Sequence, residues 1–182
     1  MPASELQPLF DLLKTAELPD LGPGPRGDVD SKPALDAKLQ TIFKTTKISS
    51  NRSELIRALI LLWHDHHDDA HTIVQDIENG DGAFIHGMVH RREPDYWNSK
   101  YWFRRVGKHP AFADISERSA QLLRATGSPV AAQLVPGGKW DPMAFVDACE
   151  SASQKPGGDA QTTLLRDLQK IETECLLEHL CS

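Results

Sequence analysis

Four of the eight histidines of this chain and three of its aspartates lie in one stretch of eight residues, 64–71, with the sequence HDHHDDAH. Imidazole nitrogens and carboxylate oxygens are the ligands by which proteins hold zinc, iron, manganese and nickel ions. The stretch follows directly on the apolar run 55–63. A polar cluster at the end of an apolar helix predicts a site set into a helical core.

The spacing of these residues favours a metal site. His64, Asp68 and His71 are four and three residues apart, so on a helix they would share one face, with Cβ atoms about 5–6 Å apart. A second pair, His86 and His90, is four residues apart on the next predicted helix, and a short glycine-containing turn would fold the two helices together. We therefore expect one divalent ion (zinc, iron, manganese or nickel) with five candidate ligands: His64, Asp68, His71, His86 and His90.

A bound ion would lower the pKa of a coordinated water molecule, so metal-assisted hydrolysis is the reaction class that fits such a site. His67 or Asp69 would then act as the catalytic base. A small anionic ligand would be held by Arg91, Arg92 and Lys100, because guanidinium groups pair bidentately with carboxylates and phosphates. The zinc-protease motif His-Glu-x-x-His is absent, and no nucleotide-binding fingerprint is present, so the substrate stays open.

The same residues fit a non-enzymatic binding or interaction protein. In that interpretation the histidines form a structural polar network, or one that responds to pH, because histidine titrates near neutrality. Arg91 and Arg92 would be neutralised internally, by Glu93 and Asp95. A third option is a groove for a peptide or protein, lined by the aromatic run 96–103. Outside these segments, His109 would either join the site or cap the helix that follows it.

The composition excludes several classes of protein. The chain has 182 residues, a length that predicts one domain, and a net charge of -6, which disfavours nucleic-acid binding. No apolar run approaches the roughly 20 residues of a membrane-spanning helix, and the N-terminus lacks a signal-peptide pattern. The three cysteines are odd in number and lack zinc-finger spacing, so they predict free thiols. We expect a cytoplasmic protein that binds neither membranes nor nucleic acid.

The apolar periodicity predicts a mainly α fold, a single-domain helical bundle with irregular loops over residues 1–182. No segment shows a strand pattern. The segment 18–30, rich in proline and glycine, predicts a flexible loop that could act as a lid. The expected helices lie at about 4–16, 33–45, 52–77, 83–92, 96–106, 110–126 and 142–150, and a last helix begins at 159 and includes the apolar stripe up to Cys175.

Four motifs in the middle of the chain also resemble a family of uncharacterised bacterial and fungal proteins. They are Trp63-His-Asp-His66, Ala70-His71, His90-Arg-Arg-Glu-Pro-Asp95 and Lys100-Tyr-Trp-Phe-Arg-Arg-Val-Gly107. The resemblance covers about residues 60–112. The family has no established activity, so the resemblance implies that this segment works as one unit and implies no reaction.

Overall fold

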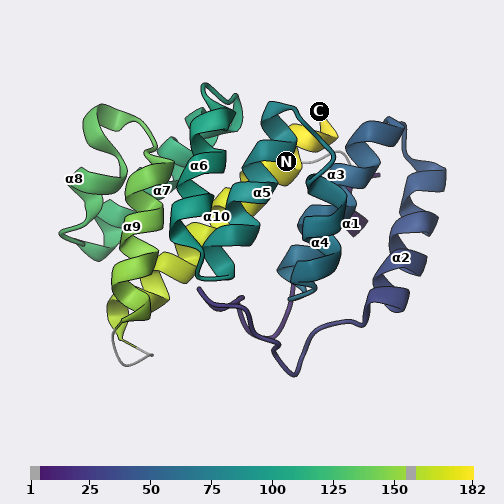
Figure 1. Cartoon of the computed structure of the whole chain (residues 1–182), viewed down its shortest axis with the longest axis horizontal. Helices are drawn as coiled ribbons and strands as arrows, with labels where there is room; N and C mark the ends of the chain where they lie inside the picture. Colours follow the sequence, from purple (N-terminus) through teal and green to yellow (C-terminus); the bar gives the residue numbers. More distant parts are fainter. Residues whose placement is uncertain (1–4, 155–158) are drawn as a thin grey trace.

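The computed structural model describes residues 5–154 and 159–182, and in that part of the chain it contains helices and no strand. The predicted mainly α, single-domain helical fold is confirmed (Figure 1). The elements in chain order are α1 (Gln7–Asp11), α2 (Lys32–Thr45), α3 (Ser50–Trp63), α4 (His67–Val74), α5 (Gly80–Arg92), α6 (Tyr96–Val106), α7 (Ala111–Thr126), α8 (Ala131–Leu134), the 3-10 turn η1 (Pro136–Gly138), α9 (Pro142–Ser153) and α10 (Ala160–Cys181).

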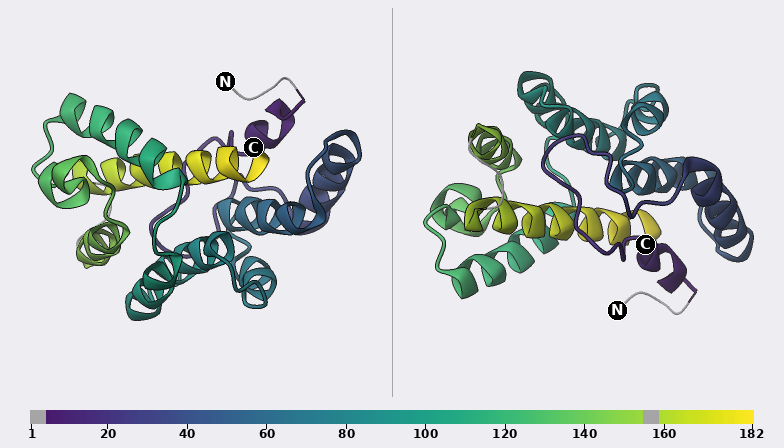
Figure 2. Two further views of the ribbon diagram at one scale, coloured as in Figure 1. Left: turned by 90° about the horizontal axis from the view of Figure 1, so that it is seen from above. Right: turned by 90° about the horizontal axis from the view of Figure 1, so that it is seen from below.

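Helix α10 is the central element of the fold. It runs through the middle of the molecule, between α7 on one side and the pair α5–α6 on the other (Figure 2). It packs on α3, whose residues 58–63 are all buried, as the apolar run in the sequence predicts. Helices α5 and α6 pack closely, because Gly87 lets the ring of Phe103 approach: a Cβ at Gly87 would lie 2.9 Å from that ring. Helix α5 of this pair carries two residues of the candidate site described below.

Capping residues set five of the helix boundaries. The side chains of Asn79, Asp95, Asp141 and Asp159 accept hydrogen bonds from backbone N–H groups in the first turns of α5, α6, α9 and α10. Gly127 follows α7 in the left-handed conformation that glycine adopts without strain. The predicted helix at 4–16 is shorter than expected. Residue 4 lies outside the described residues, and the carbonyl of Leu12 accepts a hydrogen bond from His64 instead of continuing α1.

The prediction of one helix over 52–77 is wrong, because the chain breaks between α3 and α4. Asp65 has a φ of 64°, a left-handed conformation that a short polar side chain tolerates better than most. Neither proline nor glycine marks this break in the sequence. His64, Asp68 and His71 therefore do not share one helix face, and the histidine-rich stretch is divided between two helices.

Residues 12–30, here called the strap, cross α10 without regular structure (Figure 2), as predicted for 18–30. Side chains from the helices donate hydrogen bonds to the backbone carbonyls of the strap. Arg92 donates to the carbonyls of Asp20 and Gly22, and Gln169 donates to that of Asp20. Arg166 donates to further strap carbonyls. A lid movement of the strap would have to break these bonds.

No helix within the described ranges combines the length and the apolar character that crossing a lipid bilayer requires.

Candidate metal centre

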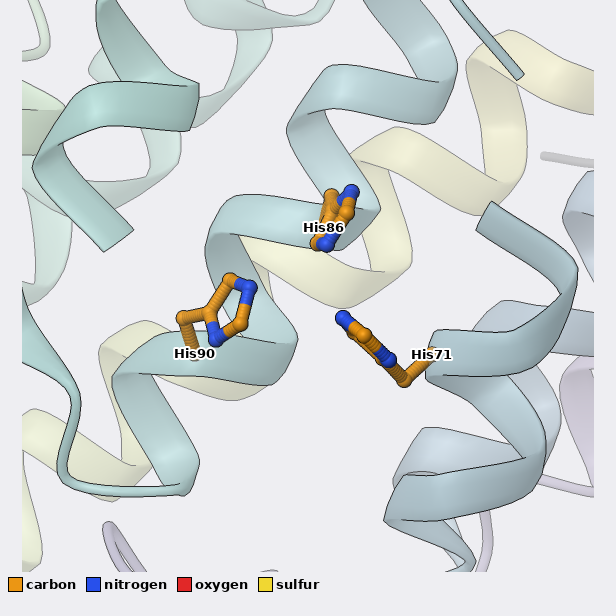
Figure 3. Close-up of side chains that lie close together, drawn as sticks. All are labelled: His71, His86 and His90. Atoms are coloured by element: carbon orange, nitrogen blue, oxygen red, sulfur yellow. The ribbon is translucent and has the colours of Figure 1, made fainter. Parts of the chain in front are cut away.

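Three of the predicted ligands converge between α4 and α5. His71 comes from α4, and His86 and His90 come from α5 (Figure 3). One ring nitrogen from each lies within 4.8 Å of the others. These three residues are called the trio below. Asn79 caps α5 directly after the turn that reverses the chain, so α4 and α5 face each other at this point.

The rings of the trio are held by packing. His86 and His90 lie one helical turn apart, and their rings stack with centroids 4.8 Å apart. His71 meets the two rings edge-on, at 4.7 Å and 5.2 Å. The indole of Trp102 on α6 covers the other face of His86, with centroids 3.9 Å apart. His86 therefore lies between two flat groups that limit the rotation of its ring.

The electrostatics of the trio favour neutral imidazoles. Burial, and then the charges that His90 and His71 would carry, lower the pKa of His86 to about 3. Burial and the nearness of His71 also lower the pKa of His90. A neutral imidazole keeps the lone pair that binds a metal ion, so near neutral pH both residues are in the form that can act as ligands.

Three neighbouring polar side chains orient the ring of His90. Its Nδ1 lies 3.2 Å from a carboxylate oxygen of Glu93 and 4.0 Å from one of Asp95. The side-chain amide of Asn98 donates to Nε2 over 3.0 Å. A carboxylate on the outer nitrogen of a metal-binding histidine fixes the ring and raises its basicity. Glu93 is placed to play this role, and Asn98 would have to move aside for an ion.

The trio can hold a metal ion if its nitrogens move closer together. Metal–nitrogen bonds of about 2.0–2.1 Å place tetrahedral ligands about 3.3 Å apart, so nitrogens as far apart as 4.8 Å must approach by small side-chain rotations. The Nδ1 of His86 is buried without a hydrogen-bond partner. An unpartnered buried polar atom costs about 1–3 kcal/mol, and coordination through this atom would remove that cost.

The structure does not bring His64 and Asp68 to the trio. Both ring nitrogens of His64 are used: Nδ1 accepts from the amide of Asp30 and Nε2 donates to the carbonyl of Leu12. The prediction that His64 is a ligand is corrected, because its ring fastens the strap. Asp68 is exposed, and it lies close enough to Glu93 that its charge contributes to raising the pKa of that carboxyl, after the larger effect of burial.

The two predicted catalytic bases also lie outside the trio. His67 is buried beside Arg92, and Asp69 lies on the surface with a carboxylate oxygen 3.5 Å from the ammonium of Lys32. Burial, and then the charge of Arg92, lower the pKa of His67 to about 4. The break at Asp65 turns His67 toward the strap, so the geometry supports neither residue as the base of a reaction at the trio.

The buried His67 predicts an acid-sensitive fold. Its folded pKa of about 4 lies below the ordinary 6.5, so on acidification the unfolded chain takes up a proton at this residue before the folded chain does. This contribution to stability is complete above pH 6.5 and is lost as the pH falls toward 4. By about pH 5 we expect His67 alone to lower the free energy of unfolding by about 1–2 kcal/mol, in addition to the effect of the other buried histidines.

Urea unfolding at about pH 7.5 and about pH 5 measures this difference. The variant His67→Gln should lose less stability than the parent protein between the two pH values, by that same amount. An equal loss in both proteins would contradict the assignment.

The predicted anion-binding residues are engaged within the protein. Arg91 is fully buried and pairs with Glu172, with two nitrogen–oxygen distances of 2.5 Å and 3.2 Å. Arg92 donates to Asp65 over 2.6 Å and to the carbonyl of Leu62. The alternative prediction was that these arginines form ion pairs within the protein. They do, but their partners are Glu172 and Asp65, and not Glu93 and Asp95. Because both guanidinium groups are occupied, the predicted anion clamp is corrected.

The third predicted anion-binding residue is also paired. Lys100, on α6, forms an ion pair with Asp147 on α9. This contact joins two helices, so it accounts for the position of Lys100 without a ligand.

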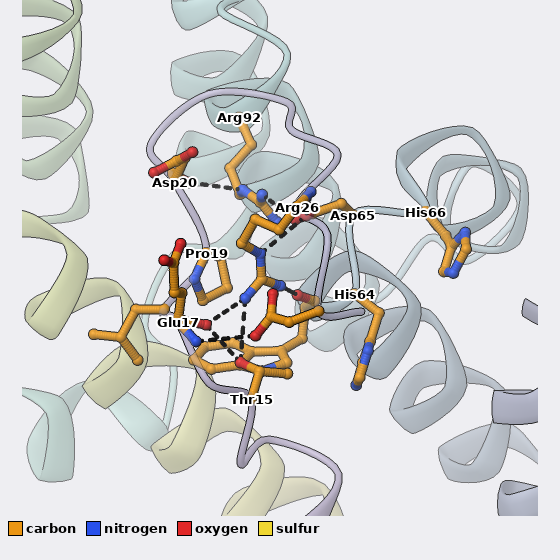
Figure 4. A network of polar contacts seen from close by, with 12 residues as sticks. Thr15, Glu17, Pro19, Asp20, Arg26, His64, Asp65, His66 and Arg92 are labelled. Carbon is orange, nitrogen blue, oxygen red and sulfur yellow. Dashed lines mark hydrogen bonds and ion pairs between the residues drawn. The ribbon is translucent and has the colours of Figure 1, made fainter. Parts of the chain in front are cut away.

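Asp65 is the central residue of the histidine-rich stretch. Its buried carboxylate accepts hydrogen bonds from Arg92 and from the side chain and backbone amide of Arg26 (Figure 4). Burial opposes its ionisation, but the hydrogen bonds from the two arginines hold its pKa below the ordinary value. Gly24 fits over it, since a Cβ there would lie 2.8 Å from the carboxyl carbon. The sequence showed Asp65 only as one aspartate among three, and nothing in it paired Arg26 with Asp65.

A second group that sequence reasoning missed consists of Asp81, His109 and His179, which come from α5, the start of α7 and α10. One oxygen of Asp81 lies 2.8 Å from Nε2 of His109 and 3.0 Å from Nε2 of His179. The amide of Ala111 donates to Nδ1 of His109, so His109 caps α7, one of its two predicted roles. The Nε2–H of His109 must then donate to Asp81, and the group is satisfied as a hydrogen-bond network.

The aromatic run of α6 is divided between the core and the surface. Phe103 is buried, and Trp102 stacks on His86. Trp97 is 75% exposed, and its ring stacks on that of Tyr101 with centroids 6.3 Å apart. The run therefore does not line one continuous groove.

Comparison with known proteins does not identify a function for this site. No family model, curated protein or solved structure matches the chain. What the trio can do must be inferred from its own chemistry.

Proposed function

We propose that this protein binds one divalent transition-metal ion, such as zinc, iron, manganese or nickel, at the trio. The observation that carries the proposal is the convergence of three imidazole nitrogens, from two helices, within 4.8 Å. Three histidines leave at least one coordination position for water or a ligand, as catalytic zinc sites do. The lowered pKa values of His86 and His90 support the proposal, because these ligands need not lose a proton to bind.

The activity that fits this site best is metal-assisted hydrolysis of a small molecule. A bound ion would act as a Lewis acid and lower the pKa of water in its open position. The protein's own residues would orient the site: Glu93 behind His90, and Trp102 against His86. Because Glu93 contacts the outer nitrogen of His90, it would orient that ligand, and we do not propose it as the general base in place of Asp69. A cytoplasmic location and a small anionic ligand complete the proposal.

Elemental analysis of protein purified without a histidine tag tests the proposal. We expect close to one equivalent of metal per chain, removed by chelator. The double variant His71→Ala/His90→Ala should bind at least about 100-fold more weakly, since loss of a mere outer-sphere partner costs about 10–100-fold. Bound metal at about 100 times its Kd should add about 2.7 kcal/mol to the free energy of unfolding.

The matched control is His109→Gln/His179→Gln, which removes two histidines from the Asp81 group. It should keep the full equivalent of metal. Metal that persists in the trio variant and is lost from the control would move the site to the Asp81 group. Folded parent protein that neither contains metal nor is stabilised by it would overturn the proposal, leaving the trio as a polar network. Circular dichroism of each variant separates loss of the site from loss of the fold.

A further inference from the structure

A cleft lies between α6, α7 and the start of α9, apart from the trio. The cleft has a volume of about 860 Å³. Ligand sites for small organic molecules occupy about 300–1,000 Å³. None of the trio residues lines it, and none of its lining residues is needed for the metal proposal.

The interior of the cleft is aromatic and apolar. Its large apolar lining residues are Phe103 from α6, Phe112 from α7, and Trp140 and Met143 from the entry to α9. Aromatic side chains offer flat faces and edges to which another ring can stack or pack. A cleft lined this way favours a planar apolar body.

The rim of the cleft is basic. Arg104, Lys108 and Lys139 line it together with one carboxylate, Glu117. Arg104, Lys108 and Lys139 are exposed, and none of the three forms an ion pair with any residue in the described ranges. The rim thus carries three positive charges and one negative charge, although the chain as a whole has a net charge of -6. This local excess raises the local concentration of small anions.

Trp140 forms part of one wall of the cleft. Trp140 is 6% exposed, and its indole Nε1 is buried without a partner. Trp140 packs on Phe145, with centroids 5.0 Å apart. The wall beside it is fixed, because the hydroxyl of Ser116 donates to the carbonyl of Gly138 over 2.8 Å. These contacts hold this wall of the cleft in place without a ligand.

We propose that this cleft binds a small aromatic carboxylate. The ring system lies against Phe103, Phe112 and Trp140, and the carboxylate is held at the rim by Lys108, Lys139 and Arg104. The apolar interior selects against inorganic anions, which have no body to fill it. The basic rim selects against amines of the same shape. This site is independent of the proposed metal centre, and each can exist without the other.

Three probes with one ring system and different head groups test the proposal: 2-naphthoate, the neutral 2-naphthamide and the cationic 2-naphthylmethylammonium. Titration calorimetry and tryptophan fluorescence should show one equivalent of 2-naphthoate bound, at least tenfold more tightly than the amide. The cation should bind more weakly still. The measurements are made on chelator-treated protein and repeated on His71→Ala/His90→Ala, where binding should be unchanged. Failure of the metal proposal thus leaves this result intact.

Two kinds of variant locate the probe. Lys108→Gln/Lys139→Gln should weaken 2-naphthoate binding about tenfold and leave the amide nearly unaffected. Ala113→Phe adds a ring to a small, exposed lining residue, so it should block all three probes without disturbing the core. The control Lys44→Gln removes a positive charge from α2 and should change nothing.

Equal binding of the three probes would overturn the assignment of an anion. Binding of 2-naphthoate that neither variant weakens would overturn the location, and no binding at millimolar concentration would overturn the site.

Discussion

Replacing Asp65 by asparagine is expected to lower the free energy of unfolding by about 3–5 kcal/mol. The side chain of Asp65 is fully buried, and its carboxylate neutralises Arg26 and Arg92, whose side chains are 4% and 3% exposed. Asparagine has the same size and tolerates the φ of 64°, so the substitution removes the charge and little else. Two buried guanidinium groups would then lack a counter-charge.

Guanidinium chloride unfolding of parent and variant measures this difference. The matched control is Asp36→Asn, which also breaks an aspartate–arginine pair, with a distance of 2.8 Å to Arg57. Both partners of that pair are about one-third exposed, so we expect a loss of at most about 1 kcal/mol. Similar losses for the two variants would show that the buried network contributes no more than a surface ion pair.

Replacing Glu172 by glutamine is expected to cost a similar amount, about 3–5 kcal/mol, for a different structural reason. Arg91 and Glu172 are both fully buried and join α5 to the central helix α10. The guanidinium carbon of Arg91 also lies 4.4 Å from the ring centroid of Phe145, and the side chain has no contact with water in the folded protein. Glutamine would leave this charge unpaired between helices.

The double variant Arg91→Met/Glu172→Leu separates charge from packing. Replacing both members of a buried pair by apolar residues is often neutral or stabilising, so the double variant should recover most of the stability that Glu172→Gln loses. Thermal or denaturant unfolding of the parent, Glu172→Gln and the double variant provides the comparison. A double variant less stable than Glu172→Gln would mean that shape, and not charge balance, determines the stability of this contact.

These two buried networks also position the trio. Arg91 and Arg92 directly follow His90 at the end of α5, where they tie that helix to α10, α3 and the strap. Because α5 is fixed on that side, His86 and His90 present their rings to α4 on the other. The residues predicted to hold a substrate thus serve to hold the helix that carries two of the candidate ligands.

The sequence by itself determined the helical class, most of the helix boundaries, and the nearness of His71 to the pair His86 and His90. These features depend on local patterns: apolar periodicity, capping aspartates, and a short turn between two helices. Such patterns act over a few residues, so a single sequence displays them.

Only the tertiary structure decided which polar residues work together. Asp65 breaks α3 from α4 because Arg26 and Arg92 stabilise it there, 39 and 27 residues away in sequence. That break turns His64 and His67 toward the strap. Glu172 meets Arg91 across 81 residues, in place of the neighbouring Glu93. A buried charge takes the partner that the packing brings to it, and spacing along the chain carries no signal of that choice.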